Sequence, residues 1–272
     1  MDEVVTKMRA DSDVEVAIRA VNAACEVIRR SYGGAVKRFE KGDKDFATGV
    51  DLAAERVIRK VLREAYPRDV ILGEEYGANT GNGSRTWLVD PLCGTVNYAA
   101  QTPLVAVNIA LRAARDVIVA VSADPLFGEV FWTSGSGAFL RRDGRDEPLV
   151  PGAGDRLVDV NLDPSFPNAV SFRAARMLVD GAFTDDFRPR VVSTTLALAW
   201  VAAGRRAAYI TDGHLRDSVH FTSGIALCQA AGCVVTNLAG QAVHTGIQGL
   251  VAASDPETHQ GLIDLVTRHR KD

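Results

Sequence analysis

Hydrophobic positions in the first part of the chain follow a helical period and then a strand-like one. Apolar side chains recur at three- and four-residue spacing over 13–32 and stop at a pair of glycines, which predicts a helix. A second helix is expected over 51–65, with Asp51 as its N-cap and Pro67 just beyond its end. Strand-like apolar runs follow at 70–74, 86–90, 104–113, 117–123 and 128–132. This part therefore predicts two helices packed on a long antiparallel sheet.

In the second part of the chain, helical and strand-like segments alternate. Helices are expected at about 170–180, 195–204, 222–232 and 255–268, and short apolar strands at 190–193, 207–211, 233–237 and 249–253. Such alternation is typical of α/β structure. Because the pattern changes around 150–155, we predict an α+β lobe over 1–150 and an α/β lobe over 151–272.

Composition narrows the class of protein. The 272 residues are 47% hydrophobic and 24% charged, as in an ordinary soluble globular protein. The net charge of −3 argues against nucleic-acid binding driven by bulk electrostatics, and no apolar run is long enough to span a membrane. The first residues lack the pattern of a signal peptide, so a cytoplasmic location is expected. The four cysteines have no CxxC spacing, which indicates neither a disulfide framework nor a zinc ribbon.

Candidate chemistry gathers where two predicted strands end. One strand runs into Asp90, followed by a proline and a Gly94-Thr95 turn, and another ends at Glu74. A strand end holds a carboxylate rigidly, which suits a hard divalent cation, and the N–H groups freed by such a turn suit a phosphate. The alternative is that Glu74 and Asp90 are only solvated carboxylates. We therefore treat this stretch as the candidate metal and anion site.

Four segments carry a resemblance to a known family. They are 45–51, 73–75, 90–98 and 219–224, in this order and joined by helices and strands of fitting length. With them the chain resembles the inositol monophosphatase-like superfamily of Mg²⁺-dependent small-molecule phosphatases, over nearly its whole length. The resemblance implies an α/β fold of layered αβαβα architecture in two lobes, with the pocket between them. It also implies a homodimer, because family members are commonly homodimers.

The resemblance assigns one Mg²⁺ ion to Glu74, Asp90 and the main-chain carbonyl of Leu92. The family's second ion is held by the shared aspartate and by two further aspartates, whose places are taken here by Cys93 and His220. Thiolate and imidazole are poor Mg²⁺ ligands and good Zn²⁺ or Fe²⁺ ligands. We therefore expect either a single Mg²⁺ ion or a softer centre that includes Cys93 and His220.

The resemblance also assigns the catalytic and substrate contacts. Asp51 would orient the Thr95 hydroxyl, and together with Glu74 these residues would activate the attacking water. The N–H groups of Gly94 and Thr95 would bind the phosphate. Asp217, in a loop that differs in length from the family's, is a candidate substrate contact or displaced ligand.

The function expected is metal-dependent hydrolysis of a phosphate monoester of a sugar, cyclitol or nucleotide-derived metabolite. Two alternatives stay open. A repurposed enzyme of specialised metabolism would use Cys93 and His220 for non-hydrolytic chemistry on a phosphorylated small molecule, and a catalytically weak protein would serve as a scaffold or regulator. Cys93 itself is open between a buried apolar filler and a nucleophile activated by a helix N-terminus. His220 is open between a ligand or acid–base group and a satisfied polar residue at a helix start.

Overall fold

A computed structural model describes residues 2–42, 45–79, 81–162, 172–213, 215, 218–243 and 249–270, with only the main chain described for 2–11 and 45. The helices of the described part are α1 (Asp2–Ser31), α2 (Gly49–Ala65), α3 (Thr95–Ala99), α4 (Gly181–Asp186), α5 (Leu196–Ala202), α6 (Thr222–Ala231) and α7 (Pro256–His269), with 3₁₀ turns at Gly154–Arg156 and Ala174–Val179. A small antiparallel hairpin, β1 (Arg38–Gly42) and β2 (Asp45–Thr48), precedes α2.

The first large sheet has the strand order β10-β9-β8-β7-β6-β5-β3-β4. Its strands are β3 (Val70–Gly73), β4 (Gly77–Ala78), β5 (Arg85–Cys93), β6 (Ala106–Ala113), β7 (Asp116–Asp124), β8 (Glu129–Thr133), β9 (Ala138–Arg142) and β10 (Arg145–Pro148). Neighbouring strands pair antiparallel except β3 and β5, which are parallel. The expected all-antiparallel sheet is therefore wrong at this one pair, because β4 turns the chain back along β3 and β5 then starts beside the start of β3.

The second sheet has the order β12-β11-β13-β15-β14. Its strands are β11 (Leu157–Asn161), β12 (Arg188–Val191), β13 (Ala208–Thr211), β14 (Val234–Thr236) and β15 (Leu250–Ala253). β11 is parallel to β12 and β13, and β15 is antiparallel to β13 and β14. This sheet begins at Leu157, after the first sheet has ended at Pro148, so the proposed lobe boundary at 150–155 lies between them.

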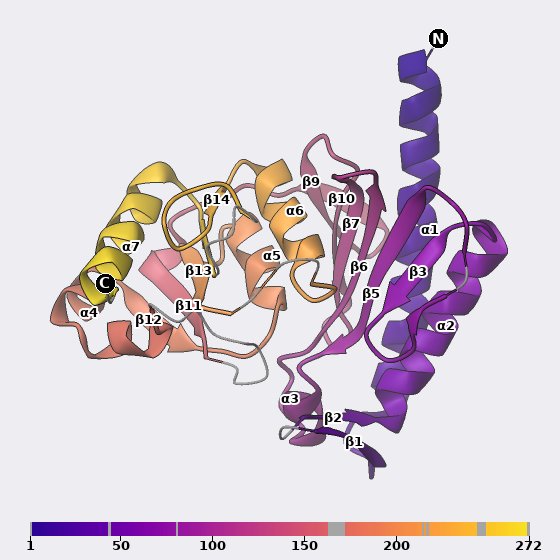
Figure 1. The fold of residues 1–272 in the computed structure, drawn as a ribbon, viewed down its shortest axis with the longest axis horizontal. Coiled ribbons are helices and arrows are strands. Elements are labelled where there is room, and N and C mark those ends of the chain that lie inside the picture. Colours follow the sequence, from indigo (N-terminus) through magenta and orange to yellow (C-terminus); the bar gives the residue numbers. More distant parts are fainter. Residues whose placement is uncertain are drawn as a thin grey trace.

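The molecule is layered, as Figure 1 shows. α1 and α2 pack on one face of the first sheet, α5 and α6 lie between the two sheets, and α7 with α4 covers the far face of the second sheet. Each interface between layers holds its own cluster of buried apolar side chains, which include Trp87, Phe221 and Phe183 respectively. The layers therefore follow in the order α, β, α, β, α, and the expected mixed α/β fold is confirmed.

Two helices differ from the expectation, and the first of them contributes to the site. α2 begins at Gly49, and its N-cap is Thr48 rather than Asp51. Asp51 is the third helical residue and accepts a hydrogen bond from the main chain of Thr48, so the two form a capping box. The helix expected at 170–180 is a short 3₁₀ turn at Ala174–Val179 in its described part.

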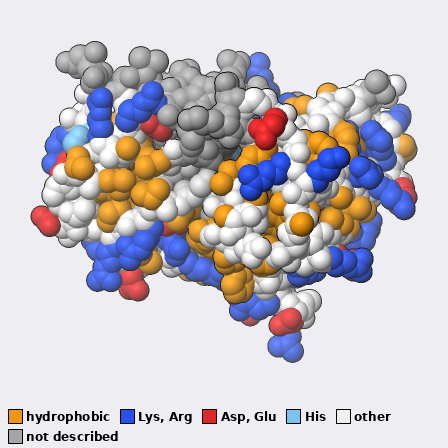
Figure 2. Space-filling view, turned by 90° about the horizontal axis from the view of Figure 1, so that it is seen from below, with side chains coloured by type: hydrophobic (Ala, Val, Ile, Leu, Met, Phe, Trp, Pro, Cys, Tyr) orange, Lys and Arg blue, Asp and Glu red, His pale blue; other side chains and the backbone are white. Residues whose placement is uncertain are grey.

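The surface combines apolar and basic side chains. Figure 2 shows hydrophobic patches bordered by Lys and Arg on the face seen from below. Large exposed apolar side chains of the described part include Phe39, Val96 and Phe127. Among the described residues, no helix has both the length and the apolar composition needed to cross a bilayer.

Candidate active site

Parallel pairing of β3 and β5 brings two carboxylates to one edge of the first sheet. Gly73 pairs with Val89, and the Glu74 N–H donates to the Val89 carbonyl at 3.0 Å. Glu74 follows the last residue of β3 and Asp90 is the next residue along β5, so the two lie side by side where the β3–β5 pairing ends. The convergence follows from topology, because parallel strands end at the same edge of a sheet.

The Asp90 carboxylate is fully buried and only half satisfied. Its Oδ2 accepts a hydrogen bond from Asn108 Nδ2 at 3.2 Å, whereas Oδ1 has no hydrogen-bond partner among the described residues. Asn108 also donates to Thr195 Oγ1 at 2.8 Å, and its own Oδ1 accepts from Ser122 and Ser223. This buried network fixes Asp90 and leaves one oxygen free for a ligand.

His220 arrives from the turn before α6 and completes a three-residue group. Its Nδ1 lies 2.9 Å from Asp90 Oδ2 and 3.8 Å from Glu74 Oε2. One ligand atom from each of Glu74, Asp90 and His220 lies within 4.8 Å of the others, an arrangement that suits a metal ion. We call these three residues the metal triad.

The charged groups of the metal triad shift one another's pKa. Burial raises the pKa of the Glu74 carboxyl, and the Asp90 carboxylate raises it further. Burial alone would lower the pKa of the His220 imidazole, but the facing Asp90 and Glu74 carboxylates outweigh it and raise that pKa to about 9. The negative field of the triad therefore favours any cation placed within it.

Lys41 supplies a further cation at the edge of the triad. Its Nζ lies 2.9 Å from Glu74 Oε1 and 2.6 Å from Glu75 Oε1. Lys41 belongs to the exposed strand β1, so the β1–β2 hairpin reaches over the strand ends that carry the carboxylates. Lys41 therefore contacts Oε1 of Glu74, whereas Oε2 of Glu74 is the oxygen near His220.

Thr95 and Asp51 form the second half of the candidate site. Thr95 Oγ1 donates to Asp51 Oδ1 at 2.8 Å and lies 3.2 Å from the Leu92 carbonyl. Burial raises the pKa of the Asp51 carboxyl, although hydrogen bonds from Thr48 and Thr95 oppose this. Gly94 precedes Thr95 with a φ of 89°, and a Cβ at Gly94 would lie 2.7 Å from the Leu104 carbonyl. The tight turn at the start of α3 therefore requires glycine.

Cys93 lies beside the metal triad without belonging to it. Its Sγ accepts the Thr195 N–H at 3.5 Å, and the ligand group found among the described residues does not include it. Burial and the Asp90 carboxylate raise the pKa of the Cys93 thiol well above its usual range, which favours the neutral thiol. The softer centre expected from the sequence, with both Cys93 and His220 as ligands, therefore includes only His220 in this geometry. Asp217 lies outside the described residues.

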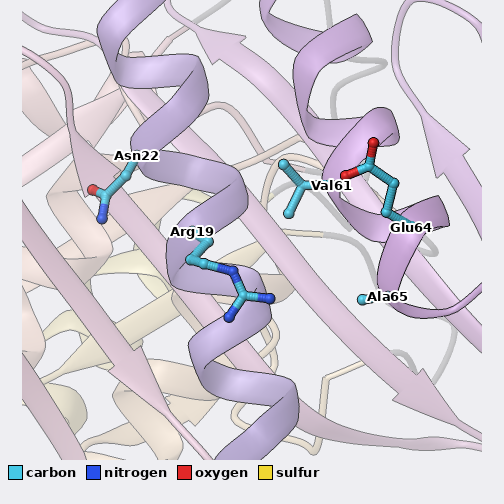
Figure 3. Close-up of a pocket in the computed structure, with 5 residues that line it drawn as sticks. All are labelled: Arg19, Asn22, Val61, Glu64 and Ala65. Atoms are coloured by element: carbon cyan, nitrogen blue, oxygen red, sulfur yellow. The ribbon is translucent and has the colours of Figure 1, made fainter.

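The cavities resolved elsewhere are separate from this site. One of 560 Å³, shown in Figure 3, lies between α1 and α2 and is lined by Arg19, Val61 and Glu64 among others. Another, of 660 Å³, lies along the basic face of α2 beside Tyr76. Neither is lined by a candidate site residue.

Sequence reasoning missed two side chains that shape the site. Lys41 stands in a polar stretch that carries no pattern signal. Asn108 had a usable signal, because it is a lone amide inside the apolar run 104–111, and a buried polar group requires partners.

A layered αβαβα fold with paired carboxylates at strand ends defines a class of small-molecule phosphatases, and comparison with known proteins agrees with it. A model of the inositol monophosphatase family matches residues 10–271. The chain therefore belongs to the inositol monophosphatase family.

Particular relatives carry two kinds of name. The chain is 35% identical to a protein named Nus factor SuhB from Salmonella typhimurium, over 91% of this chain and 93% of that protein. It is 30% identical to an inositol-1-monophosphatase from Caulobacter vibrioides, over 91% of this chain and 98% of that protein. One of these relatives is thus named as an enzyme and the other as a Nus factor.

Solved structures agree on the fold. The extragenic suppressor protein suhB from Bartonella henselae superposes with a TM-score of 0.82 at 24% identity, covering 94% of this chain and 99% of that one. The Thermotoga maritima IMPase gives a TM-score of 0.78 at 20% identity, covering 98% of both chains.

Proposed function

We propose that this protein is a divalent-metal-dependent phosphatase acting on a phosphate monoester of a sugar, cyclitol or nucleotide-derived metabolite. The observation that carries the proposal is the convergence of Glu74 and Asp90 beside the hydrogen-bonded pair Thr95–Asp51. Membership of the inositol monophosphatase family and a relative named inositol-1-monophosphatase support the reaction class. Family resemblance also supports a homodimer.

The residues fit a divalent cation. Asp90 Oδ1 is buried without a hydrogen-bond partner among the described residues, and such an atom is costly unless a ligand satisfies it. Glu74, Asp90 and the Leu92 carbonyl would hold the ion, which is Mg²⁺ in the family. Such an ion polarises the phosphoryl group and lowers the pKa of bound water.

The chain's own groups would orient water and bind phosphate. Because Thr95 Oγ1 donates its proton to Asp51, its lone pairs can accept a hydrogen bond from the attacking water. Glu74, beside the candidate ion, would help to activate that water, as the resemblance implies. The N–H groups of Gly94 and Thr95 would bind the phosphate oxygens. Asp217 would contact the rest of the substrate, on the strength of the resemblance alone.

Cys93 would line the wall of the site as a neutral thiol. A nucleophilic role needs the thiolate, and the raised pKa of Cys93 opposes it. The same observation weakens the alternative of a repurposed enzyme that uses Cys93 for non-hydrolytic chemistry.

A second candidate function is regulatory. Several relatives at 34–35% identity are named Nus factor SuhB, a name for a factor rather than a phosphatase. The chain would then act through a protein partner and hydrolyse phosphate esters weakly.

Phosphate release from a panel of inositol, sugar and nucleotide monophosphates tests the proposal. Metal-stripped protein should be inactive and should recover on addition of Mg²⁺, Mn²⁺ or Zn²⁺. Asp90→Asn and Thr95→Ala should each lower kcat at least about 100-fold, since they remove a metal ligand and the water-orienting hydroxyl. Asp264→Asn, an exposed carboxylate on α7, should leave the rate unchanged. No release from any ester with any of these ions would favour the regulatory function.

A further inference from the structure

We propose that the metal triad of Glu74, Asp90 and His220 selects a first-row transition-metal dication, of the class of Zn²⁺, Fe²⁺ or Mn²⁺, over Mg²⁺. His220 Nδ1 would be a direct ligand, and Cys93 would not. The inference rests on the metal site of the proposed function and specifies its ion.

Spacing of the donor atoms fits a single small dication. Ligands about 2.1 Å from an ion lie about 3.0 Å apart at right angles, about 3.4 Å apart in a tetrahedron and at most about 4.2 Å apart. His220 Nδ1 lies 2.9 Å from Asp90 Oδ2 and 3.8 Å from Glu74 Oε2. These two separations are close to this range, and the ligand atoms of Glu74 and Asp90 lie within 4.8 Å of each other, so a movement of the side chains would place all three atoms around one ion.

Burial and polar contacts aim these groups at a common point. Asp90 is held by Asn108 through Oδ2, and its Oδ1 is buried without a hydrogen-bond partner among the described residues. Lys41 donates a hydrogen bond to Glu74 Oε1, and the other oxygen, Oε2, faces His220. The unpartnered oxygen is the independent sign of a missing ligand, because native proteins rarely leave a buried carboxylate oxygen unpaired.

Donor chemistry then decides the ion. Mg²⁺ prefers an all-oxygen octahedron and is reluctant to exchange water for nitrogen. Two carboxylates with one imidazole form a mixed N,O set that suits zinc, iron or manganese. Cys93 is not part of the ligand group found among the described residues, so the selectivity comes from the imidazole alone.

Calorimetry and elemental analysis of the full chain, stripped and reloaded with Zn²⁺, Mn²⁺ or Mg²⁺, test this proposal. The expected result is one Zn²⁺ per chain, bound at least about 100-fold tighter than Mg²⁺, with X-ray absorption showing one nitrogen among oxygen ligands. His220→Gln should weaken Zn²⁺ binding about 100-fold with little effect on Mg²⁺, and His220→Asp should shift the preference toward Mg²⁺.

Two controls sharpen the result. His269→Gln removes a histidine that contacts Asp180 at the end of α7 and should leave both affinities unchanged. Cys93→Ala should also leave the Zn²⁺ affinity unchanged. Loss of zinc in Cys93→Ala, or equal Zn²⁺ and Mg²⁺ affinities in the native protein, would overturn the proposal.

Failure of this inference is separable from failure of the proposed function. If Mg²⁺ supports hydrolysis and His220→Gln changes no affinity, the phosphatase stands and His220 only pairs with Asp90. If zinc binds through His220 and no ester is hydrolysed with any ion, the selectivity stands and the phosphatase does not.

Discussion

At the scale of single residues, Glu55 holds the turn that presents Glu74. Its carboxylate is fully buried and accepts the N–H groups of Glu75 at 2.7 Å and Tyr76 at 3.3 Å. Arg59 Nε donates to the same carboxylate at 2.6 Å, which compensates its charge. The buried ion pair therefore fixes the main chain just after a candidate metal ligand.

Gly73→Ala should disturb this arrangement, because a Cβ at Gly73 would lie 1.9 Å from Glu55 Oε1. We expect a loss of about 1–3 kcal/mol in the free energy of unfolding, since the carboxylate must shift from its partners. Urea unfolding measures this loss. Gly181→Ala is the matched control, because a Cβ there meets nothing within 4 Å. Equal stability of the two variants would contradict the role given to Glu55.

Two residues that the resemblance names together from separate motifs also lie together in the structure. Asp51 and Thr95, named together from the resemblance, are hydrogen-bonded. The contacts of Asn108 with Thr195 and Ser223 were out of reach, because they join residues about a hundred positions apart and depend on how the layers pack.

At the scale of elements, periodicity located the long helices and core strands and missed the short ones. α2 and α7 have clear amphipathic patterns, and both were expected within a few residues. β1 is exposed along its whole length and α3 has five residues, so neither carries an apolar period. The β1–β2 hairpin that brings Lys41 to Glu74 was therefore invisible to patterning.

Asp255 gives a testable case of helix capping. Its Oδ1 accepts the Thr258 N–H at 2.8 Å at the start of α7. Burial alone would raise the pKa of Asp255, but hydrogen bonds from Thr258 and Ser254 lower it overall. Asp255→Ala should cost about 1 kcal/mol of unfolding free energy near neutral pH.

The pH dependence of this cost has a defined sign. A carboxyl whose pKa is lowered by folding stabilises the protein above its ordinary pKa of about 3.9 and loses that contribution as the pH falls through the folded value. The difference between native protein and Asp255→Ala should thus shrink in acid, as urea unfolding at several pH values would show. Thr267→Ala, exposed on the same helix and bonded to the Ile263 carbonyl, should show no such dependence.

At the scale of the whole molecule, three apolar clusters stabilise the layers, and polar contacts fix how the layers meet. Asn108 on β6 joins β5 to the starts of α5 and α6 through Asp90, Thr195 and Ser223. The candidate site is therefore assembled by the packing of the first sheet on the middle helices. Sequence periodicity predicts the layers but not this contact, because it records only which face of each element is apolar.

An ion pair between the same two layers provides the last prediction. Arg205, just after α5, donates from Nη1 to Glu129 Oε2 at 2.6 Å and from Nη2 to Glu129 Oε1 at 2.8 Å. Hydrogen bonds from Arg205 lower the pKa of Glu129, on β8, although burial opposes this. Arg205→Met keeps much of the apolar stem and leaves a mostly buried carboxylate without this partner, so we expect a cost of about 1–2 kcal/mol of unfolding free energy at neutral pH.

Because folding lowers the pKa of Glu129, the stabilisation from its carboxylate is full above the ordinary glutamate pKa of about 4.3 and is lost as the pH falls below it. Urea unfolding of Arg205→Met, Glu129→Gln and the double variant measures the coupling, which should be clear at neutral pH and vanish in acid. A coupling that is absent at neutral pH would mean that this ion pair does not help to hold the first sheet against the middle helices.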